Sequence, residues 1–301
     1  MIKKYWIPII LFLLAFQSNA QSINKSQLYS KSYDILIEMY GINVSDTGYA
    51  KQIANAYLKK AKDEEDSIKI ANGYQIIANV SKYPSTIKYL DSSISYSSNS
   101  KNINYPTVFH LLKSQYFFSY NEYERSLKSA ISAYNNATLK NNLKQQISAL
   151  HQINLVNELW GDYRKVLETE FFIEKLIRKN KKEELFFEQS LFALEGIGKC
   201  YARLKKPDSA IIYFRKGITE TLKKKDTLNY YSFVSRTGMA LSIKGKYKQA
   251  LDSLFKGDTN RSSFNKNYLP YFYYYVGKSF YNLGEIDKGV TYFKKIDSVY
   301  E

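Results

Sequence analysis

An internal repeat with a period near forty residues constrains the fold of this chain more than any other feature of its sequence. Each copy holds a helical stretch, a short turn and a second helical stretch, with small and large residues at matching places. The equivalent first-stretch positions are separated by 40, 40, 44, 40 and 39 residues: Tyr74, Ser114, Asn154, Gly198, Gly238 and Gly277. Such a period is typical of solenoids, in which a unit buries its apolar face against its neighbours.

Small and aromatic residues within a copy predict close packing between two antiparallel helices. In residues 274–296, Gly277 lets the second helix approach, and Phe280 fills the space one turn on. A short turn reverses the chain, and Gly289 and Phe293 repeat the fit on the second helix. Because the same skeleton recurs upstream, this stretch is interpreted as one helical hairpin among several, and not as a catalytic segment.

The whole chain follows this helical pattern. Apolar residues recur at helical spacing from about residue 30, while 5 prolines and 13 glycines fall mostly between the helical stretches. We therefore predict an all-α solenoid of about seven helix pairs. The expected units are approximately 27–66, 67–106, 107–146, 147–190, 191–230, 231–269 and 270–301.

Two copies carry a recognisable skeleton most clearly. These copies contain Gly277, Phe280, Gly284, Ile286, Gly289 and Phe293, and Gly198, Tyr201, Pro207, Ala210 and Phe214. The skeleton resembles the tetratricopeptide repeat, whose period is about 34 residues and whose closing proline is absent here. Another helical-hairpin solenoid is the alternative. The resemblance covers about residues 27–301 and implies a right-handed solenoid of antiparallel helix pairs that binds a protein or peptide on its concave face.

The N-terminal residues 1–20 indicate export. They hold Lys3 and Lys4, an apolar run from Tyr5 to Phe16, and a small-residue end at Ala20. This order predicts a secretory signal peptide cleaved after Ala20. An uncleaved anchor is the alternative, but the run is well short of the roughly 20 residues that span a bilayer. We expect a periplasmic or extracellular chain with no transmembrane span after cleavage.

Charge and cysteine content restrict the partners and the chemistry. Loss of residues 1–20 lowers the formal charge from +16 to +14, and the lysines are spread along the chain. This distribution favours a solvated basic surface over direct nucleic-acid binding, although it could hold the protein near an anionic envelope. Cys200, the one cysteine of the sequence, cannot form an intramolecular disulfide. Stability is therefore expected to come from packing.

No catalytic or metal-binding motif is recognisable in the sequence. His110 and His151 have no Cys, Asp or Glu at ligand spacing. Residues 196–199 resemble a fragment of a phosphate loop but lack its spacer and its hydroxyl residue. Cys200 is interpreted as a packing residue, although Lys199 and Arg203 could in principle activate its thiol. We predict a protein that is not an enzyme and has no cofactor.

The resemblance also selects candidate groove residues, because first helices line the concave face in that family. Carried over unit by unit, the groove positions are Gln75, Asn79, Gln115, Phe118, His151, Glu158, Glu195, Lys199, Arg203, Tyr271, Tyr274, Lys278, Tyr281 and Asn282. Glu195, Lys199 and Arg203 are four apart and form a charged stripe beside a tyrosine-rich patch. This combination suits an extended peptide or an amphipathic helix. An ordinary helical ion pair of Glu195 with Lys199 is the simpler interpretation.

A narrower resemblance concerns the biological setting. The export signal is combined with AKQIANAYLKKAKDEEDSIKIANGY (residues 50–74), TIKYLDSSI (86–94) and YFKKIDSVYE (292–301). Together they resemble the extracytoplasmic sensor half of bacterial helix-turn-helix regulators. The resemblance implies a sensor portion without its output domain. The alternative function is an exported envelope- or carbohydrate-binding scaffold, in which tyrosines stack on sugars.

Overall fold

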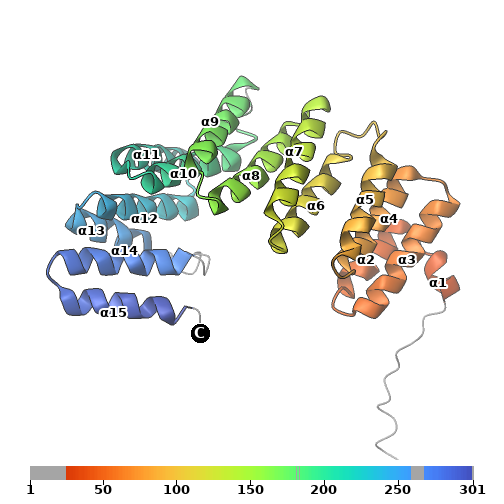
Figure 1. The fold of residues 1–301 in the computed structure, drawn as a ribbon, viewed down its shortest axis with the longest axis horizontal. Coiled ribbons are helices and arrows are strands. Elements are labelled where there is room, and N and C mark those ends of the chain that lie inside the picture. Colours follow the sequence, from red (N-terminus) through yellow and green to blue (C-terminus); the bar gives the residue numbers. More distant parts are fainter. Residues whose placement is uncertain (1–24, 181, 183, 259–267, 300–301) are drawn as a thin grey trace, which may run out of the picture. The chain divides into compact units, whose positions relative to one another are not determined.

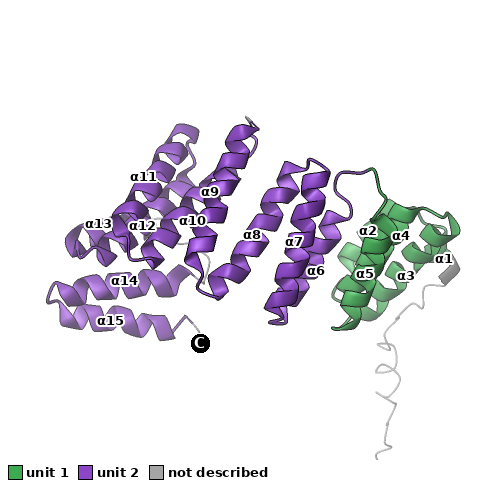
Figure 2. Cartoon of the chain, turned by 45° about the horizontal axis from the view of Figure 1, so that its top comes forward, with its two compact units in different colours: residues 1–101 green, residues 102–301 purple. Residues whose placement is uncertain are grey.

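The computed structural model describes residues 25–180, 182, 184–258 and 268–299, and all regular structure in these ranges is helical (Figure 1). Fifteen helices are present in the described part, and none of it forms a strand. The all-α prediction is confirmed. The chain divides into two units, residues 1–101 and 102–301 (Figure 2), which are described separately. The predicted signal peptide, residues 1–20, lies outside the described residues.

Unit 1 contains the first five helices. These are α1 (Lys25–Tyr29), α2 (Tyr33–Ile42), α3 (Thr47–Asp63), α4 (Ser67–Asn79) and α5 (Ser85–Ser97). Its core is formed by residues such as Leu36, Ile53 and Ile77, which are almost fully buried. Helix α4 begins after Asp66, whose carboxylate accepts hydrogen bonds from the backbone N–H groups of residues 68 and 69 at 3.0 Å. This is the usual N-cap arrangement.

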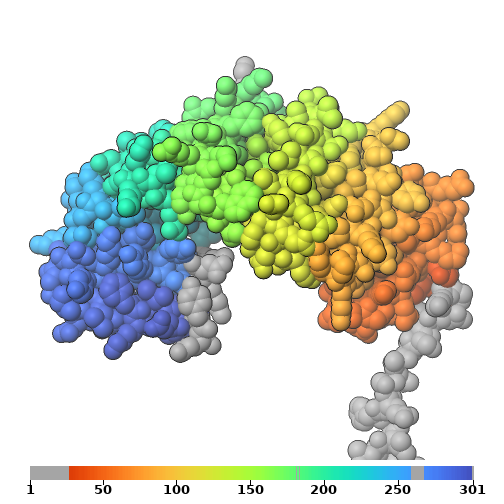
Figure 3. Space-filling view, in the orientation of Figure 1, coloured from red at the N-terminus to blue at the C-terminus, as the bar shows by residue number. Residues whose placement is uncertain are grey.

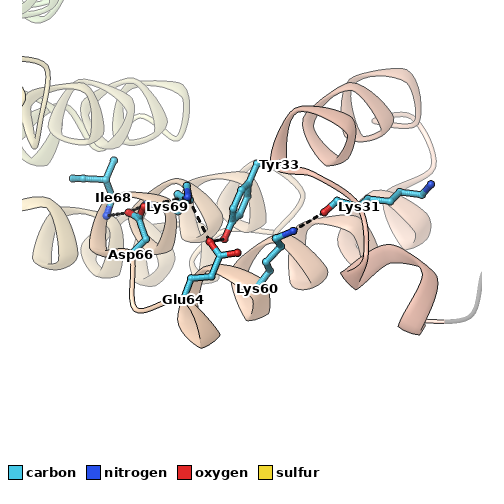
Figure 4. Close-up of polar contacts among 7 residues, drawn as sticks. All are labelled: Lys31, Tyr33, Lys60, Glu64, Asp66, Ile68 and Lys69. Carbon is cyan, nitrogen blue, oxygen red and sulfur yellow. Dashed lines mark hydrogen bonds and ion pairs between the residues drawn. The ribbon is translucent and has the colours of Figure 1, made fainter.

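Tyr33 ties α2 to the α3–α4 turn (Figure 4). Its hydroxyl donates to Glu64 Oε2 at 2.8 Å, and its ring meets Tyr57 edge-on with centroids 4.7 Å apart. The ammonium groups of Lys60 and Lys69 lie 5.2 and 4.5 Å from the ring centroid. Burial and the hydrogen bond to Glu64 raise the pKa of Tyr33. The tyrosine is therefore held as a neutral donor.

Unit 2 contains the other ten described helices. These are α6 (Thr107–Ser119), α7 (Tyr123–Leu139), α8 (Leu143–Leu159), α9 (Tyr163–Lys179), α10 (Phe187–Arg203), α11 (Pro207–Lys224), α12 (Thr227–Ile243), α13 (Tyr247–Asp258), α14 (Leu269–Asn282) and α15 (Ile286–Asp297). Consecutive helices pack as antiparallel pairs, and each pair contacts the next. In the space-filling view the pairs of unit 2 follow one another in chain order from yellow-green to blue (Figure 3). This is a solenoid of helix pairs.

Tight turns join the two helices of each of these pairs. Gly161, Gly245 and Gly284 occupy the turns after α8, α12 and α14 with φ of 74°, 84° and 84°. Asn121 and Lys205 take the equivalent left-handed conformation after α6 and α10. Glycine and asparagine reach this conformation at low cost, and it ends a helix while satisfying its last carbonyls. The predicted short turn is thus present in all five pairs, with a lysine at the left-handed position after α10 and glycine or asparagine at the other four.

Close packing within the pairs follows the predicted fit of small against large residues. A Cβ added to Gly198 would lie within 2.8 Å of three ring carbons of Phe214. One added to Gly277 would lie 2.7 Å from Phe293 Cε1. In the α6–α7 pair, Ser114 Oγ donates to the Ser126 carbonyl at 2.7 Å, and Ser126 Oγ donates back to the Ser114 carbonyl at 2.9 Å. A hydrogen-bonded serine pair therefore makes the close helix contact in α6–α7 that glycine allows in other pairs.

In the ranges given above, none of the described helices combines the length and the apolar character needed to cross a bilayer.

Candidate functional site

A pocket of about 610 Å³ opens among the first helices of the pairs in unit 2. Helices α8, α10, α12 and α14 supply most of its wall, and α6 adds Phe118. Apolar side chains such as Leu155 and Met239 lie between charged and phenolic groups. A volume of this size suits a ligand the size of a few side chains.

Arg203 lies between two tyrosine rings in this pocket. Its guanidinium carbon is 5.9 Å from the Tyr163 ring centroid and 5.6 Å from that of Tyr271. Its Nη2 donates to the Tyr271 hydroxyl at 3.4 Å. Tyr163 begins α9, Arg203 ends α10 and Tyr271 lies in α14, so three helix pairs converge on one cation.

Lys199 and Arg203 share one face of α10, because they are four residues apart. Both line the pocket and both are exposed. In the described part of unit 2, neither forms an ion pair with a carboxylate. Their charges are therefore available to a ligand, as are their hydrogen-bond donors other than the Arg203 Nη2 group that contacts Tyr271.

Arg236 of α12 adds a third cation and is already paired. It forms an ion pair with Glu195 of α10, and its guanidinium carbon lies 5.7 Å from the ring centroid of Tyr268. Tyr268 is buried and hydrogen-bonded to Ser235, and burial raises its pKa to about 12. Arg236 Nε has no hydrogen-bond partner among the described residues. The carboxylate of Glu195 thus contacts α12, and not Lys199 on its own helix.

The sequence-derived groove residues of unit 2 fall into two groups. Those lining the pocket are Phe118, Glu158, Lys199, Arg203 and Tyr271, while Glu195 reaches it through its ion pair. Those that do not line it are Gln115, His151, Tyr274, Lys278, Tyr281 and Asn282. On α14 the pocket face carries positions 271 and 275, one turn apart, whereas the family register selected 271 and 274. Gln75 and Asn79 belong to α4 and its C-terminal end in unit 1.

Among the charged and phenolic side chains that line the pocket, four were not selected from the sequence: Tyr163, Arg236, Tyr268 and Tyr275. Tyr163 begins a second helix, and the family register places only first helices on the groove. Tyr275 could have been found from its spacing of four residues from Tyr271. For Arg236 and Tyr268 the single sequence carries no comparable signal.

The pocket offers recognition chemistry and lacks an activated nucleophile among its described residues. Cys200 is buried, and burial raises the pKa of its thiol to about 12. A thiol in this state is unreactive at neutral pH. Across the described ranges, no group of three or more His, Cys, Asp or Glu side chains is placed to hold a metal ion. What the site presents is aromatic surface together with unpaired cations.

Stacked antiparallel helix pairs with a small-against-large fit define a tetratricopeptide-like helical-repeat fold. Solved structures share it. Aspartyl phosphate phosphatase F from Bacillus subtilis is similar with a TM-score of 0.65 and 16% identity, covering 92% of this chain and 71% of that one. A tetratricopeptide repeat protein from Parabacteroides merdae has a TM-score of 0.58 and 18% identity, covering 91% and 93%.

A third similar structure is a Rap protein complexed with Competence and Sporulation Factor. Its TM-score is 0.57 with 13% identity, and the match covers 92% of this chain and 77% of that one. No protein-family model matches this chain, and no curated protein sequence matches it. At these identities the similarity concerns the fold.

Proposed function

We propose that this chain is a non-enzymatic helical-repeat scaffold that binds a protein or peptide in the unit 2 pocket. The observation that carries the proposal is Arg203, held between Tyr163 and Tyr271 without a carboxylate partner. Stacking on aromatic rings orients a guanidinium while leaving its N–H groups free to donate. A pre-oriented donor surrounded by tyrosines is typical of binding surfaces.

The form of the ligand follows from the size and position of the pocket. First helices supply most of its wall, which supports the concave face of the solenoid as the binding face. The volume fits a few side chains of an extended peptide or one face of an amphipathic helix. The Rap protein that is similar in fold carries a bound factor, so this class of fold can accommodate a partner.

The setting of this function is also a proposal. Residues 1–20 would direct export, the helix pairs would form the seven units expected from the repeat, and the chain would act as the sensor part of a bacterial signalling regulator. The support is the order of charged, apolar and small residues in 1–20 and the resemblance of residues 50–74, 86–94 and 292–301. Detection of a mature N-terminus at Gln21 in a secreted or periplasmic fraction would test export.

Crosslinking and pull-down with residues 21–301 would test binding. A captured protein would be identified, purified and titrated against variants of equal helical content. Arg203→Glu and Tyr271→Ala should each weaken binding at least about tenfold, because each removes part of the stacked cation. Lys278→Glu is the matched control, since Lys278 does not line the pocket. Failure to capture any partner, or equal affinity of all variants, would contradict the proposal.

An envelope- or carbohydrate-binding scaffold is the second candidate function. It is favoured by exposed tyrosines such as Tyr274 and Tyr281, which are 46% and 51% exposed, and by the +14 charge after signal removal. Electrostatic adhesion weakens as salt shortens the range of charge interactions. Envelope association that disappears at high ionic strength would support this candidate, and salt-resistant binding of one polypeptide would support the first.

A further inference from the structure

A buried carboxyl interrupts the repeat in the α8–α9 pair. Sixteen residues after the glycine of the first helix, three other pairs place a large apolar side chain: Phe214 after Gly198, Leu254 after Gly238, and Phe293 after Gly277. The same spacing from Asn154 reaches Glu170, which is only 5% exposed. A position that elsewhere packs a hydrocarbon here holds an ionisable group. Such departures from the pattern occur most often at sites with a function.

The polar groups around Glu170 are incompletely satisfied. Asn154 Nδ2 donates to Glu170 Oε1 at 2.9 Å, and His151 Nδ1 lies 3.9 Å from the same oxygen. Three further polar atoms of this cluster, Glu170 Oε2, Asn154 Oδ1 and His151 Nε2, are buried without a hydrogen-bond partner in the described part of the chain. Unsatisfied buried polar atoms are costly, and their concentration at one point calls for an explanation.

Helix α10 is shaped to accept this carboxyl. A Cβ added to Gly196 would lie 2.8 Å from Glu170 Cδ and 2.9 Å from Oε1. The absence of a side chain at Gly196 therefore provides the space that Glu170 occupies. Three helices, α8, α9 and α10, meet at this cluster.

The electrostatic surroundings favour a neutral carboxyl. The titratable groups facing Glu170 are His151 and Glu158 of α8 and Glu195, Lys199 and Cys200 of α10. Burial raises the pKa of Glu170 to about 7, and Glu158 and Glu195 add to this rise. The hydrogen bond from Asn154 and the charge of Lys199 oppose it. Burial lowers the pKa of His151, so the histidine does not supply a positive charge at neutral pH.

We propose that Glu170 is a proton-operated switch in which the neutral carboxylic acid keeps α8, α9 and α10 closed and the carboxylate opens them to water. An ionised carboxylate held by one hydrogen bond in a protein interior is strongly unfavourable. On deprotonation the proton passes to solvent, and the charge gains hydration only if the packing around it loosens. Lys199 and Cys200 of α10 also line the pocket, so the opening acts on the pocket wall. An effect on ligand affinity rests on the proposed function, whereas the opening itself does not.

The sign and size of the effect follow from the two states. The closed state raises the pKa of this acid above its ordinary value of 4.5, so the contribution of Glu170 to closure is complete below pH 4.5 and is lost as pH rises through about 7. If opening returns Glu170 to its ordinary pKa, the opening equilibrium constant increases roughly 50- to 100-fold between pH 5 and pH 8.

Hydrogen exchange of residues 21–301, detected by mass spectrometry between pH 5 and pH 8, would test the switch without any ligand. After correction for intrinsic exchange rates, the protection of α9 and α10 should fall roughly 50- to 100-fold from pH 5 to pH 8. Helices α12 and α13 of the same molecule serve as the internal reference. Glu170→Gln keeps an acceptor for Asn154 but cannot ionise, so its protection should not fall as the pH rises. Glu168→Gln, an exposed neighbour on α9, is the matched control and should behave as the unmodified chain.

Two results would overturn the switch. In the first, hydrogen-exchange protection of α9 and α10 in the unmodified chain changes with pH only as much as that of α12 and α13. This result does not depend on whether any variant folds. The other is an equal loss of protection in Glu170→Gln. A fall in the unmodified chain that is absent only in the Glu170 variant would support it.

Discussion

Gly198→Ala tests whether the fit of small against large residues holds the helix pairs together. The added methyl would lie within 2.8 Å of three ring carbons of Phe214. Phe214 is 2% exposed and packs within a cluster that includes Leu191 and Phe233, so its ring has little room to move. Overpacking of this kind costs about 1–3 kcal/mol. The better helix propensity of alanine offsets up to about 1 kcal/mol.

The net expectation is a loss of about 1 kcal/mol, up to about 2, in the free energy of unfolding. The measurement is urea denaturation of residues 21–301 followed by far-UV circular dichroism. Gly41→Ala is the control, because it makes the same substitution in a helix where nothing lies within 4 Å of the new methyl. It should be neutral or stabilising by up to about 1 kcal/mol.

Phe214→Leu provides the partner for a double-mutant cycle. Leucine lacks the ring carbons that the new methyl would strike, so Gly198→Ala should be close to neutral in the Phe214→Leu background. Equal losses in both backgrounds would show that the ring is not the obstacle. Stabilisation by Gly198→Ala to the same extent as Gly41→Ala would refute the packing argument altogether.

Three further predictions concern single contacts. Tyr33→Phe removes the 2.8 Å hydrogen bond to Glu64 and should lower the stability of α2 and α3 by about 0.5–1 kcal/mol. Hydrogen exchange in these helices should become faster, and unchanged exchange would contradict the prediction. Ser114→Ala and Ser126→Ala should each lower the free energy of unfolding, measured by urea denaturation, by about 1 kcal/mol. The double variant should lose less than the sum of the two single losses, and strictly additive losses would argue against a reciprocal pair. Burial lowers the pKa of His151, so the contribution of this histidine to stability is complete above pH 6.5 and is lost as pH falls below it. In the Glu170→Gln background, where the opposing ionisation of Glu170 is absent, denaturation between pH 7 and pH 5 should show this loss, and His151→Gln should remove it; an identical pH profile with and without His151 would contradict it.

The helix pairs and their turns could be predicted because their signals are local. Apolar residues three and four apart mark a helix, and Gly161 or Asn121 marks the turn that ends it. Gly198 and Phe214 lie sixteen residues apart, and two antiparallel helices joined by a short turn bring such positions together. Repetition of the signal near every forty residues made the solenoid predictable as well.

The candidate site was predictable only in part, because it depends on contacts between pairs. Lys199, Arg203 and Tyr271 were selected from the family register, but Tyr163 was not, since it begins a second helix. Arg203 and Tyr271 are 68 residues apart in the sequence, and only the stacking of successive pairs places one against the other. Glu195 shows the same limit, because its own helix offers Lys199 as a partner and the tertiary structure pairs it with Arg236 instead.

Glu170 is the clearest example of which features follow from the sequence and which follow from the tertiary structure. The sequence by itself places Glu170, which was not selected as a candidate, sixteen residues after Asn154 and therefore on the face of α9 that meets its partner helix. Only the tertiary structure decided that the carboxyl lies against Gly196 of the next pair, with its second oxygen unsatisfied. The physical reason is that helical periodicity fixes which face of a helix is buried, whereas the depth of burial and the identity of the neighbours arise from packing between pairs.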